Sequence, residues 1–269
     1  PLWTELGSTV NFWNTPIYGY YRGNDGWVQR KQGELLANAG VDVVFTDNTN
    51  GINTWRNSYT SLMNTWSDAM SDGVKTPKVS FMLPFWDKGY TRTQVQMLYL
   101  DIFRQNKWPE LWFYWDEKPM LMAMGDSFNA AESLTDKEIS RFFTFRPGQP
   151  GYLVEKTEYS TWGWLSMYPQ ELYYKNAKEQ KAGNVEQMTV GIAQNHDYEH
   201  HLLAAMSGNH ITGRSYTTDY ENRFEVEGAE ASKWGYNFAE QWQYALEVNP
   251  KVVFVTGWNE WIAGRYEKW

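Results

Sequence analysis

The sequence predicts an α/β fold in which about eight strands, each followed by a helix, close into a (β/α)8 TIM barrel. Short apolar runs alternate with longer amphipathic runs, and the chain of 269 residues suits one barrel, which needs about 250 residues. A doubly wound sheet is the alternative, but neither a GxGxxG nor a GxxxxGKS phosphate loop follows any apolar run. We therefore expect residues 1–269 to form a single barrel domain.

The first half of the chain shows the clearest alternation of strands and helices. The expected strands are residues 17–23, 41–47 and 78–86. The expected helices are residues 25–40, 55–73 and 91–105. The strands are apolar and rich in β-branched or aromatic residues, whereas the apolar residues of the helices recur at helical spacing. Asp25 is the expected N-cap of the first helix, and Thr91 or Thr93 that of the third.

The second half of the chain is less regular. Residues 112–125 are expected to form a hairpin, with a turn that begins at Asp116 and Glu117. The other expected elements are strands 143–147, 162–170, 187–197 and 251–261, helix 135–143 opened by Thr135, and helix 238–248. The chain ends at Trp269, where an eighth helix should follow, so either the barrel lacks a regular eighth helix or the sequence is a fragment.

Composition and charge argue against several classes of partner. Lys and Arg number 24 against 32 Asp and Glu, a net charge of −8, which disfavours nucleic acid and anionic membranes. The chain has no cysteine, so it forms no disulfide and no cysteine–zinc site. It contains no apolar run of about 18 residues, so no membrane span is expected.

The chain begins at Pro1 without a basic and apolar leader, which fits a mature or trimmed product. An extracellular or periplasmic location is expected, with a cytoplasmic location left open. The oligomeric state is also left open.

Aromatic residues are unusually frequent, with 16 Trp, 18 Tyr and 13 Phe, or 17% of the chain. Many of them must serve the core. Trp and Tyr also combine a flat apolar face with a polar edge, which matches the C–H face and hydroxyl rim of a sugar ring. The excess therefore suggests carbohydrate as a partner.

Polar residues beside an aromatic residue follow nearly every expected strand, at the end where barrel enzymes carry their active sites. Three of them are carboxylates that a barrel would bring together: Asp47, Asp87 and Glu260. Glycoside hydrolysis needs two, one to protonate the leaving oxygen and one to attack the sugar or activate water. Trp258 and Trp261 flank Glu260, which is expected to raise its pKa and suit it to the acid role.

The residues expected to contact the sugar are aromatic platforms, amides and cations from the same strand ends. They are Tyr21, Arg22, Asn48, Trp86, Tyr168, Asn195, His196, Trp258, Asn259 and Trp261. Arg22 and Arg146 would suit a charged sugar. Structural roles remain open for the acids: Asp47 as a helix cap or a residue that fixes the turn, Asp87 in an ordinary turn and Glu260 at the barrel rim.

A metal site is the alternative role for the histidines. His196 and His200 stand four residues apart, and on a helix this spacing could bind zinc. No third ligand is identifiable, so no metal and no cofactor is expected. A metal-dependent hydrolase that uses His196 and His200 remains an alternative function.

The sequence GWNEW at residues 257–261 resembles glycoside hydrolases of family 99, their family 71 relatives and WbsX-like domains. The opening βαβ pattern up to residue 50 is similar to the first unit of such barrels. The resemblance implies a (β/α)8 barrel that cleaves glycosidic bonds, often α-linked, without a metal for the chemistry.

The resemblance also implies that Glu260 matches the family glutamate that acts on the sugar 2-hydroxyl. The family pattern has a second glutamate, the general acid/base, three residues later, and Ala263 stands in that place here. Either Asp47 or Asp87 supplies the partner, or this is a distinct subfamily, or the chain is a catalytically inactive carbohydrate-binding barrel.

Overall fold

The structure is a computed structural model that describes residues 16–128, 133–149, 159–192, 195–197, 199, 202–203, 211–213 and 234–257. These residues fall into two compact units, one of Tyr18–Trp162 and one that contains the described residues from Gly163 onward. Each unit is described by itself.

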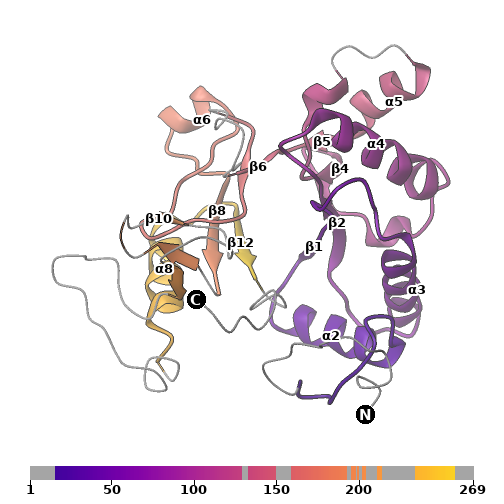
Figure 1. Ribbon diagram of the computed structural model, residues 1–269, viewed down its shortest axis with the longest axis horizontal. Coiled ribbons are helices and arrows are strands. Elements are labelled where there is room, and N and C mark those ends of the chain that lie inside the picture. The colour runs from indigo at the N-terminus through magenta and orange to yellow at the C-terminus, as the bar shows by residue number, and fades with distance from the viewer. Residues whose placement is uncertain are drawn as a thin grey trace. The chain divides into compact units, whose positions relative to one another are not determined.

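The first unit alternates helices with short strands (Figure 1). Its α-helices are α2 (Gly26–Asn38), α3 (Arg56–Ser71), α4 (Lys88–Leu98) and α5 (Leu134–Phe142). Its strands are β1 (Val43–Asp47), β2 (Lys78–Met82), β3 (Tyr114–Trp115), β4 (Lys118–Leu121), β5 (Thr144–Phe145) and β6 (Gly148–Gln149). A π-helix η1 (Tyr99–Phe103) continues α4, and two 3-10 helices are η2 (Pro109–Leu111) and η3 (Gly125–Phe128). The short strand β7 (Trp162–Gly163) lies at the boundary of the two units.

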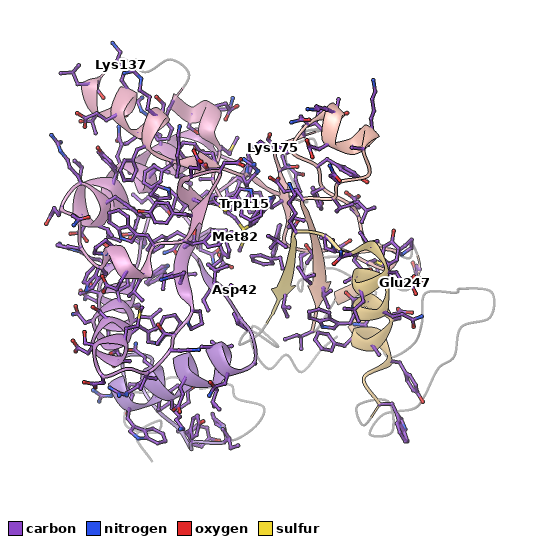
Figure 2. The ribbon with its side chains drawn as sticks, turned by 180° about the vertical axis from the view of Figure 1, so that it is seen from behind. Asp42, Met82, Trp115, Lys137, Lys175 and Glu247 are labelled. Carbon is purple, nitrogen blue, oxygen red and sulfur yellow. The ribbon has the colours of Figure 1, made fainter. Side chains whose placement is uncertain are left out.

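Strands β1, β2, β4 and β5 of the first unit follow one another in parallel. β1 pairs with β2 so that Asp47 lies opposite Met82, at the carboxyl ends of both strands. Met122, just after β4, donates its N–H to the carbonyl of Phe81 at 3.0 Å and accepts the N–H of Leu83 at 2.8 Å. β4 pairs in parallel with β5 and antiparallel with β3. Figure 2 shows Asp42 and Met82 toward opposite ends of the β1–β2 pair.

One face of these strands carries the main hydrophobic core. Helices α3 and α4 lie along this side of β1 and β2 (Figure 1), and Val44 packs against the core from the strand side. Phe45 points to the other face, because side chains alternate along a strand, and its ring lies 5.9 Å from Phe113 and 6.1 Å from Trp162. Fully buried members of the core are Phe81, Leu83, Val95, Leu98, Ile102, Leu111, Leu121 and Ile139.

Helix α2 packs against α3 at Gly33 with no room for a side chain. The indole N–H of Trp66 donates to the carbonyl of Gln29 at 2.8 Å, which draws the ring onto α2. A Cβ at Gly33 would lie 2.6 Å from the indole nitrogen, closer than a real Cβ contact allows. Glycine at this position therefore sets the distance between the two helices.

Replacing Gly33 with alanine is expected to lower the free energy of unfolding by about 1–2 kcal/mol, because the cost of overpacking exceeds the gain in helix propensity. Urea denaturation measures this change. Gly26→Ala in the same helix is the matched control, since its new Cβ would meet nothing closer than 3.6 Å. Equal stability of the two variants would show that α2 and α3 separate at little cost.

The second unit contains one parallel strand pair covered by a helix. Its elements are α6 (Ala177–Lys181), β8 (Gln187–Gly191), β9 (Asn195–Asp197), β10 (Leu202–Leu203), β11 (Ile211–Gly213), α8 (Tyr236–Val248) and β12 (Val252–Thr256). β12 pairs in parallel with β8. Met188, Val190 and Ala245 form the buried core between this pair and α8, with Trp242 packed against it. Figure 2 shows Glu247 on α8.

Most expected elements of the first half are confirmed. β1 lies within residues 41–47, α3 within 55–73 and α2 within 25–40. Asp25 caps α2, since its side chain accepts the N–H of Val28 at 3.1 Å. The hairpin is also confirmed, because β3 and β4 are joined by Asp116 and Glu117, both with positive φ. Helix 238–248 and the last strand appear as α8 and β12.

The strand predictions for residues 17–23 and 187–197 are wrong, and those for residues 78–86, 143–147 and 162–170 are too long. Residues 17–23 form turns instead of a strand: Gly19 has a φ of +70°, and Arg22 accepts the N–H of Asp25 at 2.9 Å. Residues 187–197 are not one strand, because β8 ends at Gly191 and β9 pairs antiparallel with β11. Within residues 162–170 only Trp162 and Gly163 are extended.

Two of the expected helix caps are also wrong. Helix α4 is capped by Asp87, whose carboxylate accepts the N–H of Tyr90 at 3.0 Å, so the helix begins before Thr91. Helix α5 is capped by Ser133, which accepts the N–H of Asp136 at 3.0 Å, so Thr135 lies inside the helix. In both cases an earlier side chain bonds to the N–H three residues further on, as N-caps do.

The described ranges contain short separate sheets, and no closed ring of strands runs through them. The α/β character and the parallel strand pairs are therefore established, and the closed barrel stays a prediction. Among the described helices, none has both the length and the apolar character that a membrane span requires.

Candidate functional site

The carboxyl ends of β1 and β2 bring four predicted site residues to one edge of the sheet. Asp47 is the last residue of β1 and is followed by Asn48, while Trp86 and Asp87 follow β2 along the chain. Since β1 and β2 are parallel neighbours with Asp47 opposite Met82, both connections leave the sheet at the same edge. This edge is the candidate functional site of the first unit.

Asp47 presents an exposed carboxylate at this edge. One of its oxygens accepts the N–H of Thr49 at 2.9 Å and the hydroxyl of Thr49 at 2.7 Å. These local bonds fix the turn after β1 and orient the carboxylate. Of the two structural roles left open for Asp47, fixing the turn is confirmed, whereas Asp47 caps no described helix. Its exposed carboxylate remains accessible to a ligand.

Asn48 is buried, with 3% of its surface exposed, and its amide serves the connection itself. The hydroxyl of Thr46 donates to its oxygen at 2.7 Å, and its nitrogen donates to the carbonyl of Thr54 at 2.9 Å. Both ends of the amide are therefore bonded within the chain. A contact with a sugar remains a prediction for Asn48, whereas its positioning of residues 48–54 is observed.

Gln94 of α4 holds the same connection from outside. It is fully buried, and its amide nitrogen donates to the carbonyls of Asn48 at 2.9 Å and Gly51 at 2.8 Å. A third carbonyl, that of Asn53, lies 3.4 Å from the same nitrogen. Gly51 has a φ of +80°, which glycine adopts without strain, and this lets the chain turn around the amide. One side chain thus fixes the path of the β1–α3 connection.

Asp87 and Trp86 start the next helix. The carboxylate of Asp87 is the N-cap of α4, as described above, and Trp86 is half-buried with its ring 5.8 Å from that of Phe85. The Asp87 carboxylate thus holds the start of a helix, whereas the Asp47 carboxylate holds a turn. The expectation of an ordinary turn at Asp87 is replaced by a helix cap, and its catalytic role remains a prediction.

Trp55 is an unexpected residue of this edge that the sequence analysis did not identify. It ends the β1–α3 connection with a φ of 53° and a ψ of 48°, the left-handed conformation that costs a residue with a side chain about 1–2 kcal/mol. Its side chain is 54% exposed. The sequence carried only one signal of it, a tryptophan within a run of small polar residues, and no sequence rule predicts a left-handed tryptophan.

Arg56, the next residue, anchors the start of α3 to the π-helix η1. Asp101 of η1 accepts the Nε and Nη2 of Arg56 at 2.9 and 2.5 Å, the hydroxyl of Tyr59 at 2.5 Å and the ammonium of Lys107 at 3.3 Å. Burial alone would raise the pKa of Asp101, but these donors together hold it below its usual value. Asp101 is therefore ionised and neutralises Arg56.

Tyr59 completes this cluster as a neutral donor. Burial and the bond to the Asp101 carboxylate raise the pKa of Tyr59 far above its ordinary value. Its phenol thus stays protonated at all physiological pH and donates permanently to Asp101.

Tyr21 and Arg22 do not follow a strand. They lie exposed in the turns before α2, where the Tyr21 hydroxyl accepts the side-chain N–H of Gln32 at 3.0 Å. Arg146 lies just after β5 and is buried, with its side chain 5% exposed and its guanidinium 2.9 Å from the Asp116 carboxylate. This ion pair already neutralises Arg146, which leaves less reason to expect a charged sugar there.

A cavity of about 500 Å³ lies at the other end of β1 and β2, where the strands begin. Its lining includes Val41, Asp42, Val74, Lys75 and Phe113. In barrel folds this end serves stability and the opposite end carries the chemistry. The cavity is therefore separate from the candidate functional site.

In the second unit, Tyr168 lies with its ring 5.8 Å from that of Tyr244 on α8. Asn195 and His196 lie in β9, opposite Gly213 and Thr212 of β11. His196 lies in a strand and not on a helix, and His200 lies outside the described residues, so the alternative metal site is not tested. Among the described residues, no group of three or more His, Asp and Glu could hold a metal ion.

The residues on which the sequence analysis places the acid chemistry lie outside the described residues. They are Trp258, Asn259, Glu260, Trp261 and Ala263, directly after the described chain ends at Gly257 beyond β12. Their predicted roles stay predictions.

Two solved structures resemble this chain over nearly its whole length. The GH99 endo-α-mannosidase from Bacteroides thetaiotaomicron is similar with a TM-score of 0.55 and 14% sequence identity, over 94% of this chain and 72% of that one. The same enzyme in complex with bis-tris-propane gives a TM-score of 0.53 and 15% identity, over 92% of this chain and 75% of that one. No protein-family model and no curated protein sequence matches the chain.

Proposed function

We propose that this chain, which has a GH99-like glycoside hydrolase fold, cleaves glycosidic bonds in a polysaccharide or glycan by carboxylate acid/base chemistry. The observation that carries the proposal is the fold likeness over 94% of the chain, together with the WNEW sequence at its last strand. The similar enzymes are endo-α-mannosidases, so an α-mannan is the first substrate to test.

The proposal includes closure of the strands into a (β/α)8 barrel, in which acids from different strand ends share one mouth. Glu260 follows β12, and Asp47 and Asp87 follow β1 and β2. Asp47 is the better candidate for the partner of Glu260, because its carboxylate is exposed and caps no described helix, whereas Asp87 caps α4. Ala263 occupies the place of the second family glutamate, which is why another strand must supply the partner.

The proposed reaction breaks the bond between the anomeric carbon and the leaving oxygen. One carboxylic acid donates its proton to that oxygen as the bond breaks. The other carboxylate stabilises the positive charge that develops on the sugar ring, by attack or by deprotonating a water molecule. Water supplies the hydroxyl of the new reducing end, and no metal or cofactor takes part.

A second candidate function is carbohydrate binding without cleavage. The observation that favours it is Ala263, since loss of the family acid/base removes one half of the known catalytic pair. The exposed aromatic residues at the site edge would serve a binding protein equally well.

Incubation with α-mannan and a panel of other neutral glycans, followed by measurement of new reducing ends, tests the proposal. Release that persists in the presence of a chelator is the expected result, and it also excludes the metal-dependent alternative. Binding of a glycan without release would support the binding function. Absence of both binding and release across the panel would contradict the two candidate functions together.

A further inference from the structure

We propose that Trp55 forms a sugar-binding subsite of its own, which stacks a neutral pyranose unit of a long glycan away from the bond that is cleaved. The inference rests on the proposed function and adds a place where the chain grips its ligand. It is carried by the geometry of the β1–α3 connection, which begins at the candidate catalytic residue Asp47 and ends at Trp55.

The conformation of Trp55 is the first observation. An indole that is 54% exposed gains little from burial, yet the backbone holds it in the left-handed region with a φ of 53°. Single exposed apolar residues are common and need no explanation, but a strained backbone at an exposed aromatic residue does. Strained positions persist where the surroundings impose them, and they gather at ligand-binding sites.

The rigidity of the support is the second observation. Gln94 fixes the connection before Trp55 through the carbonyls of Asn48 and Gly51, and the Asp101 carboxylate holds Arg56 directly after it. The backbone of Trp55 is thus fixed on both sides. A ring on a fixed backbone loses little conformational entropy when a ligand stacks on it, which favours binding.

The polar groups around Trp55 are the third observation. Asn50, Asn53 and Asn57 are exposed, and in the part of the chain that the structure describes their side chains make no hydrogen bond. Each amide offers two donors and an acceptor, the groups that sugar hydroxyls pair with. An exposed indole with unpaired amides close to it in the sequence offers an apolar face and polar groups, the two kinds of contact that a pyranose takes.

The charge of the surroundings selects a neutral sugar. Arg56 is the cation next to Trp55, and its guanidinium already makes two hydrogen bonds to the Asp101 carboxylate. An anionic sugar would have to compete with that carboxylate, which the bonds from Tyr59 and Lys107 also hold in place. Ile52, three residues before Trp55, is 49% exposed and adds apolar surface and no charge.

The test measures glycan binding in a Glu260→Gln background, which removes the proposed acid and separates binding from turnover. Calorimetry compares tetrasaccharides with disaccharides from α-mannan, α-glucan, β-glucan and xylan. Trp55→Ala is expected to weaken binding of the preferred tetrasaccharide about 10-fold, equal to about 1.4 kcal/mol, and to leave the disaccharide unchanged. Trp55→Phe keeps an aromatic face and is expected to retain most of the affinity.

Trp27→Ala is the matched control, because Trp27 is 62% exposed in the same unit but lies in the regular helix α2. Circular dichroism and Tm confirm that each variant folds. If Trp55→Ala binds the tetrasaccharide as tightly as the parent, the subsite is refuted while the proposed function stands. If the parent binds none of the glycans and the wild type releases no reducing ends, both the subsite and the proposed function are refuted.

Discussion

Replacing Glu260 with glutamine is expected to lower kcat for glycan hydrolysis about 10³-fold and to leave glycan binding nearly unchanged. Glutamine has the size of glutamate but can neither donate a proton to the leaving oxygen nor carry negative charge, and general acid–base groups contribute about 10²- to 10⁴-fold. Reducing-end assays at saturating substrate measure kcat. Because the change acts on the transition state, KM should stay within about 3-fold of its original value.

Two substitutions of the same kind, Asp47→Asn and Asp87→Asn, identify which carboxylate acts together with Glu260 in catalysis. Asp87→Asn keeps a good N-cap for α4, so it removes the charge without removing the cap. Asp47→Asn keeps an acceptor for the N–H and hydroxyl of Thr49. We expect Asp47→Asn to lower kcat strongly and Asp87→Asn to have little effect. Full activity of Glu260→Gln would remove Glu260 from the chemistry.

The largest expected effect on stability comes from Asp136, a fully buried carboxylate that joins α5 to α4. It accepts the guanidinium of Arg92 at 2.5 Å and the side-chain amide of Gln96 at 2.6 Å. Asp136→Asn keeps the volume but removes the charge that pairs with Arg92, and it replaces one of the two acceptor oxygens with a donor NH2 group. We expect the free energy of unfolding to fall by about 3 kcal/mol, since breaking a buried charged network costs more than breaking a surface pair.

The surface pair of Lys88 and Asp126 provides the control for this prediction. Its side chains are 60% and 46% exposed, and the two charges are 2.6 Å apart. Asp126→Asn is expected to cost less than about 1 kcal/mol, because water screens exposed pairs. Chemical denaturation of both variants gives the comparison, and equal losses would mean that burial of Asp136 adds nothing.

The stabilisation by Asp136 depends on pH in a defined direction. Burial would raise the pKa of this carboxyl, but the bonds from Arg92, Gln96 and Ser133 hold it below its ordinary value of 3.8. A depressed pKa in the folded state means that the stabilisation is complete above about pH 4 and declines as the pH falls further. The difference in Tm between wild type and Asp136→Asn should therefore narrow in acid.

Elements with local signals were predictable from the sequence. Helix α3 follows from apolar residues at helical spacing, of which Met63, Trp66 and Ala69 are buried. The turn at Asp116 and Glu117 follows from the run Asp-Glu-Lys-Pro, which is typical of turns, and the cap at Asp25 follows from its place before the helix. In each case the residues that determine the structure lie within a few positions of it.

The wrong predictions concern elements that depend on contacts with residues far away in the sequence. Residues 17–23 contain the aromatic and apolar residues of a strand, but a strand requires pairing partners, and Gly19 turns the chain instead. The break between β8 and β9 depends on pairing of β9 with β11, which no local rule reveals. The sequence predicts a catalytic role or an ordinary turn for Asp87 and not a helix cap, because the start of α4 has few apolar residues to mark it.

The candidate site was predictable only in part for the same reason. The sequence indicated the residues at the strand ends, and parallel pairing of β1 with β2 brings Asp47, Asn48, Trp86 and Asp87 to one edge. It did not indicate that Asn48 is buried or that Trp55 is held in a left-handed conformation. The connection that contains Asn48 is held by Gln94, which stands 46 positions after Asn48, so no local pattern indicates this contact.

The three carbonyls gathered by Gln94 have a consequence for engineering. The shape of the β1–α3 connection is encoded by a residue of another helix, so exposed positions such as Asn50, Ile52 and Asn53 are free to vary in side chain. Variants in which these positions are randomised and Gly51 and Gln94 are kept would retain the same backbone conformation in the connection. The side chains of the β1–α3 connection can therefore be exchanged to change ligand preference while the backbone of the unit stays the same.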